Sequence, residues 1–178
     1  MAGSLRVIAG EAGGRRLSAP AGRRLRPTSE RVREAVFASL SSQGTVEGAS
    51  FLDLFAGTGA MGIEALSRGA ASATFVDDDP VALATIRANL EATGLAGAAT
   101  VVRSDAVRFL DGGGATFDVA VADPPYAFSG WDAVLAGLRP RTGLAVLEAG
   151  AEIDLGLGWE AVRARRYGGT VVILARPR

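Results

Sequence analysis

The sequence contains no cysteine, no histidine and no lysine, and each absence removes a class of chemistry. Without cysteine the chain can form no disulfide and no thiolate metal site. Without histidine it has no imidazole base or metal ligand, and without lysine it has no Schiff-base amine and no Walker-type phosphate loop. All 19 basic residues are therefore arginine. Any reaction must use carboxylates, hydroxyls, backbone groups and guanidinium groups, and we expect no bound metal.

Long apolar runs are also missing. No segment approaches the roughly 20 apolar residues of a membrane-spanning helix, so we expect no membrane contact. The first residues, MAGSLRVIAGEAGG, lack the apolar core of a signal peptide, which favours a cytoplasmic protein. A length of 178 residues, with 48% hydrophobic and 21% charged, is typical of one soluble domain with a substantial core. We expect a monomer.

The net charge is zero, but the charges are unevenly distributed. Residues 1–33 hold eight Arg against two acids, a balance of +6, and the remaining 145 residues hold 11 Arg against 17 acids, a balance of −6. Such asymmetry predicts an arm that meets a polyanion, although a solvated basic face gives the same count. We therefore divide the chain into an arginine-rich hairpin or arm, residues 1–27, and a main domain, residues 28–178.

Strand-like apolar runs alternate with segments of helical periodicity along the main domain. Strands are predicted at 51–55, 73–77, 100–103, 117–122 and 144–148, with a closing pair at 159–166 and 170–176. Helices are predicted from Thr28 or Ser29 to about Ser42 and at 60–68, 80–93, 106–110 and 131–138. This order predicts an α/β fold with a mainly parallel sheet and helices on both faces. Residues 5–9 and 15–19 are predicted to form a small β-hairpin before it.

The stretch FLDLFAGTGAMG, residues 51–62, combines a buried strand, a glycine-rich turn and the start of a helix. Gly57 and Gly59 let the backbone turn tightly and approach a ligand, because no Cβ is in the way. Asp53 interrupts the apolar strand and needs a polar partner if it is buried. The spacing also matches the dinucleotide-binding fingerprint, which is a weak signal by itself. The pattern indicates a small-molecule site at the carboxyl end of this strand.

Two further acids follow the second and third predicted strands. Asp77 lies 20 residues after Gly57, a distance that suits an acid that accepts hydrogen bonds from ribose hydroxyls. Its neighbours Asp78 and Asp79 are interpreted as an exposed residue and a helix cap, although the choice between Asp77 and Asp78 stays open. Asp105 is suited to accept from an exocyclic adenine amine, and capping the helix at 106 is an equal alternative.

The motif Asp123-Pro124-Pro125-Tyr126 follows the fourth predicted strand. Its prolines stiffen the backbone and favour an extended residue before each of them. The Asp123 carboxylate and the Pro124 carbonyl can then present two acceptors to a planar exocyclic amine, and Tyr126 can stack on its ring. The alternative is a rigid turn with a structural tyrosine. Phe128 is a second possible stacking surface, but core packing is the simpler interpretation of it.

These motifs carry a family resemblance. DLFAGTGAMG and DPPY together resemble class I S-adenosylmethionine-dependent methyltransferases that act on amino groups, with a Rossmann-like fold. RVIAGEAGGRRL, RPTSERVREAVF, GIEALSRGA and the later YGGTVVIL resemble the RsmD family, which methylates the exocyclic N2 of a guanine in small-subunit (16S) ribosomal RNA. The resemblance implies an enzyme with S-adenosylmethionine as cofactor. It also implies ribosomal RNA or an assembling small subunit as partner.

The family pattern, carried over by position, assigns the remaining roles. It places the methionine end of the cofactor over Asp53, Gly57 and Gly59, the ribose on Asp77, and the adenine on Asp105 and the Ala106 backbone. Many relatives have Glu at the ribose position, so the shorter Asp77 changes the distance. The target guanine would be held by the catalytic set Asp123, Pro124 and Tyr126. RNA phosphates would meet Arg15, Arg16, Arg23, Arg24 and Arg26.

Several alternatives remain at this point. Arg26 and Thr28 can close over the cofactor instead of meeting RNA. The DPPY-type motif also fits an amino methyltransferase for DNA adenine or protein glutamine. A nicotinamide dehydrogenase is disfavoured by the missing His and Lys and by DPPY. A non-catalytic RNA-binding module is the last alternative, and the intact DPPY motif argues against it.

Overall fold

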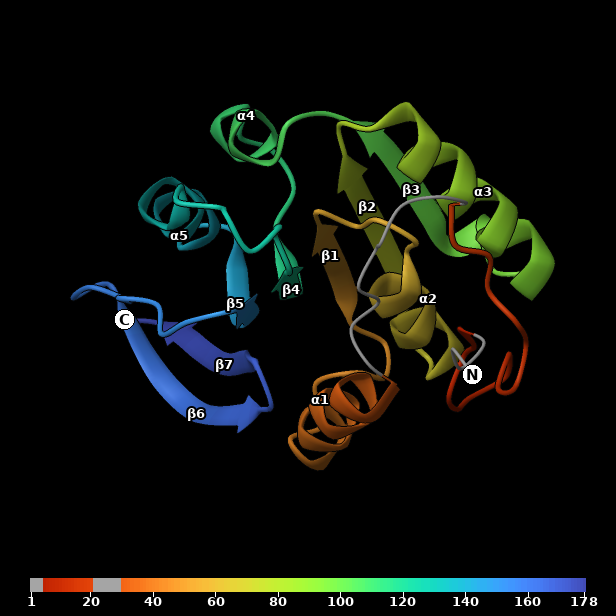
Figure 1. Ribbon diagram of the computed structural model, residues 1–178, viewed down its shortest axis with the longest axis horizontal. Helices are drawn as coiled ribbons and strands as arrows, with labels where there is room; N and C mark the ends of the chain where they lie inside the picture. Colours follow the sequence, from red (N-terminus) through yellow and green to blue (C-terminus); the bar gives the residue numbers. More distant parts are fainter. Residues whose placement is uncertain (1–4, 21–29) are drawn as a thin grey trace.

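The computed structural model describes residues 5–20 and 30–178. Their main element is a seven-stranded sheet with the order β3-β2-β1-β4-β5-β7-β6 (Figure 1). The strands are β1 (Ser50–Leu54), β2 (Ser72–Asp77), β3 (Ala99–Arg103), β4 (Phe117–Ala122), β5 (Thr142–Ala149), β6 (Trp159–Tyr167) and β7 (Thr170–Pro177). The helices are α1 (Glu30–Ser42), α2 (Ala60–Ser67), α3 (Pro80–Thr93), α4 (Ala106–Asp111) and α5 (Trp131–Leu138), with a short 3₁₀ turn η1 (Ala96–Ala98).

The first five strands in chain order are parallel to one another, and β7 runs antiparallel to both β5 and β6. The predicted Rossmann-like α/β fold and its closing strand pair are confirmed. The chain leaves β1 toward β2 and β3 on one side and returns to β4 and β5 on the other. The sheet therefore has its topological switch point between β1 and β4, where open α/β sheets bind ligands.

Helices cover both faces of the sheet. Figure 1 shows α4 and α5 on one side and α1, α2 and α3 on the other. The side chains of β1 contribute to the hydrophobic core on each face of the sheet, because successive side chains of a strand point to opposite faces. Phe51 packs with α1 and α2, whereas Leu52 and Leu54 pack with α4 and α5. None of the helices in the described ranges is both long and apolar enough to cross a bilayer.

Local sequence signals set the ends of several helices. Asp79 caps α3 by accepting from the Val81 amide at 3.0 Å, Pro80 occupies the first helical position, and Gly94 ends the helix with a left-handed φ of 75°. Gly62 has a packing role in α2: a Cβ there would lie 2.3 Å from Cε1 of Phe75. Glycine at this position lets α2 lie close against β2.

Residues 5–20 follow a hairpin path that differs from the predicted pair of strands. The two arms run antiparallel, but they form one bridge, between Arg6 and Arg16. Three backbone hydrogen bonds flank this bridge: the Leu17 amide donates to the Leu5 carbonyl, the Val7 amide to the Arg15 carbonyl and the Gly14 amide to the Val7 carbonyl. The amides that follow Val7 donate to α2. The Ile8 and Ala9 amides both donate to the carboxylate of Glu64, at 2.8 and 3.1 Å. The segment is thus packed on the main domain, with its apolar side chains Val7, Ala12 and Leu17 in the core.

Candidate active site

The carboxyl ends of the parallel strands bring four predicted acids to one edge of the sheet. Asp53 lies in β1, Asp77 ends β2, Asp105 follows β3 and Asp123 follows β4. The charges of Asp123 and Asp77 both act on Asp53 and raise its pKa, after the larger effect of burial. The structure therefore gathers these three acids at the switch point.

Asp77 is bound to the glycine loop between β1 and α2. Its Oδ2 accepts from the Gly57 amide at 2.8 Å, and its Oδ1 accepts from the Asp79 amide at 3.0 Å. Gly57 and Gly59 both have left-handed backbones, with φ of 57° and 76°. Asp78 is exposed. Asp77 is thus the acid of this run that faces the loop, and its carboxylate keeps further lone pairs for a ligand.

Asp53 is 4% exposed, and its Oδ2 accepts from the amide of Gly62 in the first turn of α2, at 2.9 Å. Burial raises the pKa of this carboxyl group to about 8, against the smaller lowering effect of the Gly62 hydrogen bond. Asp53 therefore carries a proton at neutral pH. A cation that binds beside it would favour the ionised form.

Asp105 is exposed and caps α4, because its Oδ1 accepts from the Arg108 amide at 3.0 Å. The capping alternative is therefore present in the structure, and the adenine contact stays a prediction. Ala106 is buried at the first position of α4. One oxygen of Asp105 serves the cap, so a second acceptor on the same carboxylate can still serve a ligand.

The loop after β4 holds a largely exposed tyrosine in a fixed position. Tyr126 is 54% exposed, and its hydroxyl lies 3.2 Å from the hydroxyl of Thr170 at the start of β7. Its ring packs on Gly150, where an added Cβ would lie 2.5 Å from Cδ1 of the ring. Pro124 is buried. A planar group can therefore lie on a ring whose edge and hydroxyl are already held.

Phe55 is a site residue that the sequence pattern missed. It was predicted as the last residue of the strand, but β1 ends at Leu54 and Phe55 has a left-handed φ of 59°. Non-glycine residues rarely adopt this conformation, and those that do are often found at functional sites. Its ring meets Phe128 edge to face at 5.1 Å, and Phe128 meets Trp131 in the same way at 5.7 Å. The packing interpretation of Phe128 agrees with these contacts.

The predicted RNA-binding arginines divide into two groups. Arg15 and Arg16 are exposed, and Arg15 Nη1 donates to the Ala92 carbonyl near the end of α3, at 3.1 Å. The others lie outside the described residues, together with Thr28: Arg23, Arg24 and Arg26. The phosphate contacts of all five arginines stay predictions.

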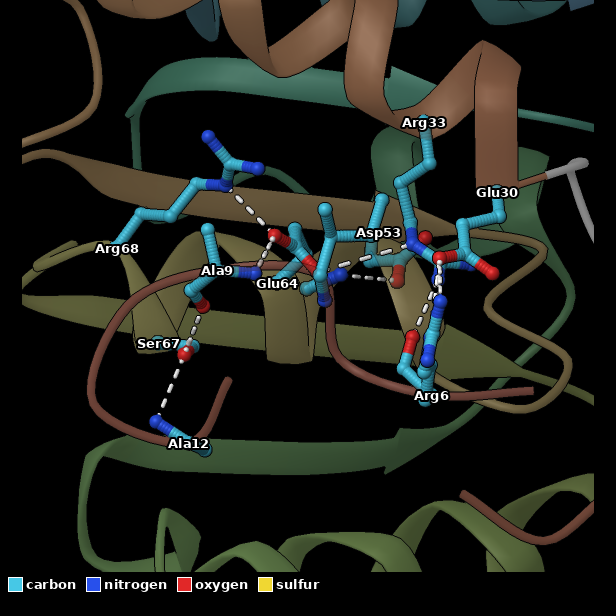
Figure 2. Close-up of polar contacts among 11 residues, drawn as sticks. Arg6, Ala9, Ala12, Glu30, Arg33, Asp53, Glu64, Ser67 and Arg68 are labelled. Atoms are coloured by element: carbon cyan, nitrogen blue, oxygen red, sulfur yellow. Dashed lines mark hydrogen bonds and ion pairs between the residues drawn. The ribbon is translucent and has the colours of Figure 1, made fainter. Parts of the chain in front are cut away.

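A buried charge network lies behind the site, and sequence reasoning did not find it (Figure 2). Arg33 and Glu64 are both fully buried and form an ion pair, with 3.7 Å between Nε and Oε2. Arg68 Nε donates to the other Glu64 oxygen at 2.6 Å. Burial lowers the pKa of Arg33, and the charge of Glu64 opposes that shift. Arg33 therefore does not belong to the exposed basic cluster in which the charge count placed it.

The sequence and the fold of this chain are similar to those of known proteins. The family model described as "Conserved hypothetical protein 95" matches residues 5–176. "Ribosomal RNA small subunit methyltransferase D" of Escherichia coli is 44% identical over 124 residues, which cover 70% of this chain and 61% of that protein. "Putative rRNA methyltransferase YlbH" of Bacillus subtilis is 38% identical over 159 residues, 85% of each chain. The solved structure "Putative methyltransferase yhhF from Escherichia coli" superposes with a TM-score of 0.86 at 34% identity, over 99% of both chains.

Proposed function

Because this chain belongs to the conserved hypothetical protein 95 family, the RsmD family that its sequence resembles, we propose that it methylates the exocyclic N2 of a guanine in small-subunit (16S) ribosomal RNA. S-adenosylmethionine is the proposed methyl donor. The substrate is naked RNA or an assembling small subunit in the cytoplasm. The observation that carries the proposal is the position of Asp123-Pro124-Pro125-Tyr126 on the strand next to the glycine loop of β1.

The residues of the glycine loop fit the proposed cofactor. A Cβ built on Gly57 would have Phe55 O as its nearest neighbour, at 3.8 Å, so a ligand can approach this backbone closely. Asp53 would hold the ammonium group of the methionine end, Gly57 and Gly59 would line it, and Asp77 would accept from the ribose hydroxyls. When bound, S-adenosylmethionine supplies a methyl group on a sulfonium leaving group.

Asp105 and the Ala106 backbone would hold the adenine at the end of β3. Asp105 is exposed at this edge, and its capping bond to the Arg108 amide fixes its carboxylate in one direction. A fixed acceptor can take a hydrogen bond from an exocyclic amine without further ordering of its side chain. Ala106 is the first residue of α4, directly after the capping Asp105, so its backbone amide lies on the same turn.

The residues after β4 would hold the target base. The Asp123 carboxylate and the Pro124 carbonyl would accept the two N–H bonds of the guanine amine and aim its nitrogen at the methyl group. Tyr126 would stack on the ring, which contributes about 1–3 kcal/mol per base. The guanine must be unpaired or flipped out to reach this site.

Alignment is the main task of such a site. Holding two reactants in line can lower a barrier by about 7 kcal/mol or more in ideal cases. The attacking nitrogen would gain positive charge as the N–C bond forms and the thioether leaves, and the Asp123 carboxylate beside it would stabilise that charge. The methylated amine would then lose one N–H proton to solvent, which gives the neutral product. No histidine base is needed for these steps, in agreement with a chain that has none.

The experiment that tests the proposal offers the protein radiolabelled S-adenosylmethionine with unmodified small-subunit RNA, partly assembled subunits, DNA or bulk protein. Labelled RNA is digested and its nucleosides are identified. N2-methylguanosine at one site is the expected result. Label on DNA or protein would move the activity to another amino substrate. Measurable cofactor binding with no label on any substrate would leave either a non-catalytic module or an enzyme that needs a further partner.

A further inference from the structure

One of the two edge strands of the sheet, β6, lies at the far end from β3 and has exposed side chains over most of its length (Figure 1). Among the described residues it pairs only with β7, and of its own nine residues only Trp159 is buried. Three of its exposed side chains are Arg163, Arg165 and Arg166, which we call the edge-strand arginines. The single acid of this strand, Glu160, lies near its opposite end.

This strand is a basic feature on an otherwise acidic body. Residues 159–178 hold five Arg against one acid, a balance of +4, whereas residues 34–158 hold six Arg against 16 acids, a balance of −10. In the described part of the chain, no carboxylate forms an ion pair with an edge-strand arginine. No carboxylate of the described residues therefore neutralises these guanidinium groups.

A groove runs between β6 and α1. Arg163, Arg165 and Tyr167 line one side, and Ala35 and Ser39 of α1 line the other. Arg163 Nη1 donates to the Ser39 hydroxyl at 3.3 Å, which holds this guanidinium across the groove. A guanidinium has five N–H donors, so this bond leaves most of its donor capacity for a ligand.

The carboxyl end of β6 lies beside the proposed base pocket. Tyr167 pairs with Thr170 across the β6–β7 turn, and the Thr170 hydroxyl lies 3.2 Å from that of Tyr126. At about 3.3 Å per residue, Arg165 lies about 7 Å and Arg163 about 13 Å along the strand from Tyr167. Arg163 and Arg165 thus form a track on the α1 side of β6 that starts next to the proposed target base and leads away from it. Arg166, which pairs with Val171, points to the opposite face of the strand and flanks the same open edge.

We propose that the edge-strand arginines bind phosphates of the RNA segment that flanks the target guanine. This inference rests on the proposed methyltransferase function and gives β6 a second RNA contact, separate from the N-terminal arginines. Guanidinium groups bind phosphate through paired N–H donors, and such contacts position a nucleic acid without reading its bases. The track would hold the RNA strand while its guanine lies on Tyr126.

A different role for charges on an exposed edge strand is to prevent pairing with another sheet. Charge of either sign serves that role, whereas phosphate binding requires positive charge. Substitution by glutamate therefore separates the two roles. Arg165 and Arg166 are the best positions, because both are exposed and the contact of Arg163 with Ser39 is left intact.

The experiment compares R165E/R166E with R176E/R178E. Arg176 and Arg178 are exposed at the opposite end of the same hairpin, so both pairs change the net charge equally. Binding of a fluorescein-labelled single-stranded oligoribonucleotide is measured against salt, and KM values are measured with unmethylated small-subunit RNA. We expect R165E/R166E to weaken RNA binding and raise the RNA KM on the order of tenfold, and to reduce the salt slope by about 1.4, because each lost phosphate contact removes about 0.7. The KM for S-adenosylmethionine should not change.

If the two double variants weakened RNA binding equally, the effect would come from net charge alone, and the inference would be overturned. RNA binding that stays at the wild-type level in R165E/R166E would also overturn it. Thermal unfolding and gel filtration check that the variant folds and stays unassociated, and R165Q/R166Q replaces it if it does not. A wild-type protein that methylates no RNA would overturn the proposed function instead, and the binding measurement would still test the arginines.

Discussion

Phe55 and Phe128 meet edge to face, with their ring centroids 5.1 Å apart and their planes at 66°. This contact joins the loop after β1, where the cofactor is proposed to bind, to the loop after β4, where the base is proposed to bind. Both loops follow neighbouring parallel strands, so the strands set their separation and the two rings fix their relative position. The sheet and the aromatic pair together align the two halves of the proposed site.

Phe128→Leu should slow methyl transfer by about 2- to 10-fold, because an edge-to-face pair contributes about 0.5–1.5 kcal/mol beyond the buried area. The affinity for S-adenosylmethionine should stay unchanged, since Leu leaves the glycine loop intact. Single-turnover transfer to RNA measures the effect. Phe117→Leu is the matched control, because Phe117 starts β4 at the opposite edge of the sheet. Equal rates for the two variants would mean that the pair does not position the loop.

Asp123→Ala should lower methyl transfer on the order of a hundredfold or more, because it removes the carboxylate that stabilises the positive nitrogen. Cofactor binding should be largely retained, and calorimetry measures it separately from transfer. Asp132→Ala is the control, since Asp132 is exposed in the first turn of α5. Transfer at the wild-type rate in Asp123→Ala would remove Asp123 from the catalytic set.

Asp77→Asn should weaken S-adenosylmethionine binding about tenfold or more, because a hydrogen bond to a charged group contributes about 1.5–3 kcal/mol. Asp78→Asn should have no effect, since Asp78 is exposed and Asp77 holds the glycine loop. Equilibrium binding of the cofactor to both variants measures this difference. The reverse order of effects would assign the ribose to Asp78.

The elements were predictable where the sequence marks their ends with backbone chemistry. Asp79, Pro80 and Gly94 delimit α3 because a cap, a fixed φ and a left-handed glycine each leave a residue type at a fixed position. The strands of the sheet were predicted from apolar runs of sequence that end near Gly, Asp or Pro. The acids of the site were found in the same way, because parallel strands bring residues at their carboxyl ends to one edge.

Other features depend on contacts that no local pattern records. The left-handed backbone of Phe55 was missed because Phe is a strand-forming residue, and the turn is set by the loop that follows. The burial of Arg33 was missed because arginine is normally exposed, and its partner Glu64 lies 31 residues away in the sequence. The same carboxylate accepts from the Ile8 and Ala9 amides and so holds the N-terminal hairpin on α2, which is another contact between distant segments.

Glu64→Ala should lower the free energy of unfolding by about 3–5 kcal/mol, because it leaves the buried charge of Arg33 without its ion-pair partner. Urea denaturation measures this, and amide exchange at Ile8 and Ala9 should accelerate as their acceptor is lost. Glu34→Ala, on the exposed face of α1, is the control. The double variant Arg33→Met/Glu64→Leu should recover part of the loss, because no charge stays buried without a partner, whereas the Ile8 and Ala9 amides still lack their acceptor. A loss no larger than in the control would show that the pair does not stabilise the fold.

Asp53 should make cofactor binding dependent on pH. Its carboxyl group has a pKa of about 8 in the free protein, raised first by burial, so it is protonated at neutral pH. The proposed ammonium partner favours the ionised carboxylate, so binding lowers this pKa and releases a proton. Affinity for S-adenosylmethionine should therefore rise with pH through the neutral range toward the pKa of the free protein, about 8, and fall again where the ammonium group of the ligand loses its own proton.

Calorimetry in two buffers of different ionisation enthalpy measures that proton release directly. Asp53→Asn should abolish both the release and the rise in affinity, because an amide does not titrate in this range. Its carbonyl oxygen can still accept from the Gly62 amide, which keeps the first turn of α2 in place. Asp132→Asn, on the exposed surface of α5, should behave as the wild type. Binding without proton release at neutral pH would mean that the methionine end does not lie over Asp53, because a cation there would ionise the buried carboxyl group.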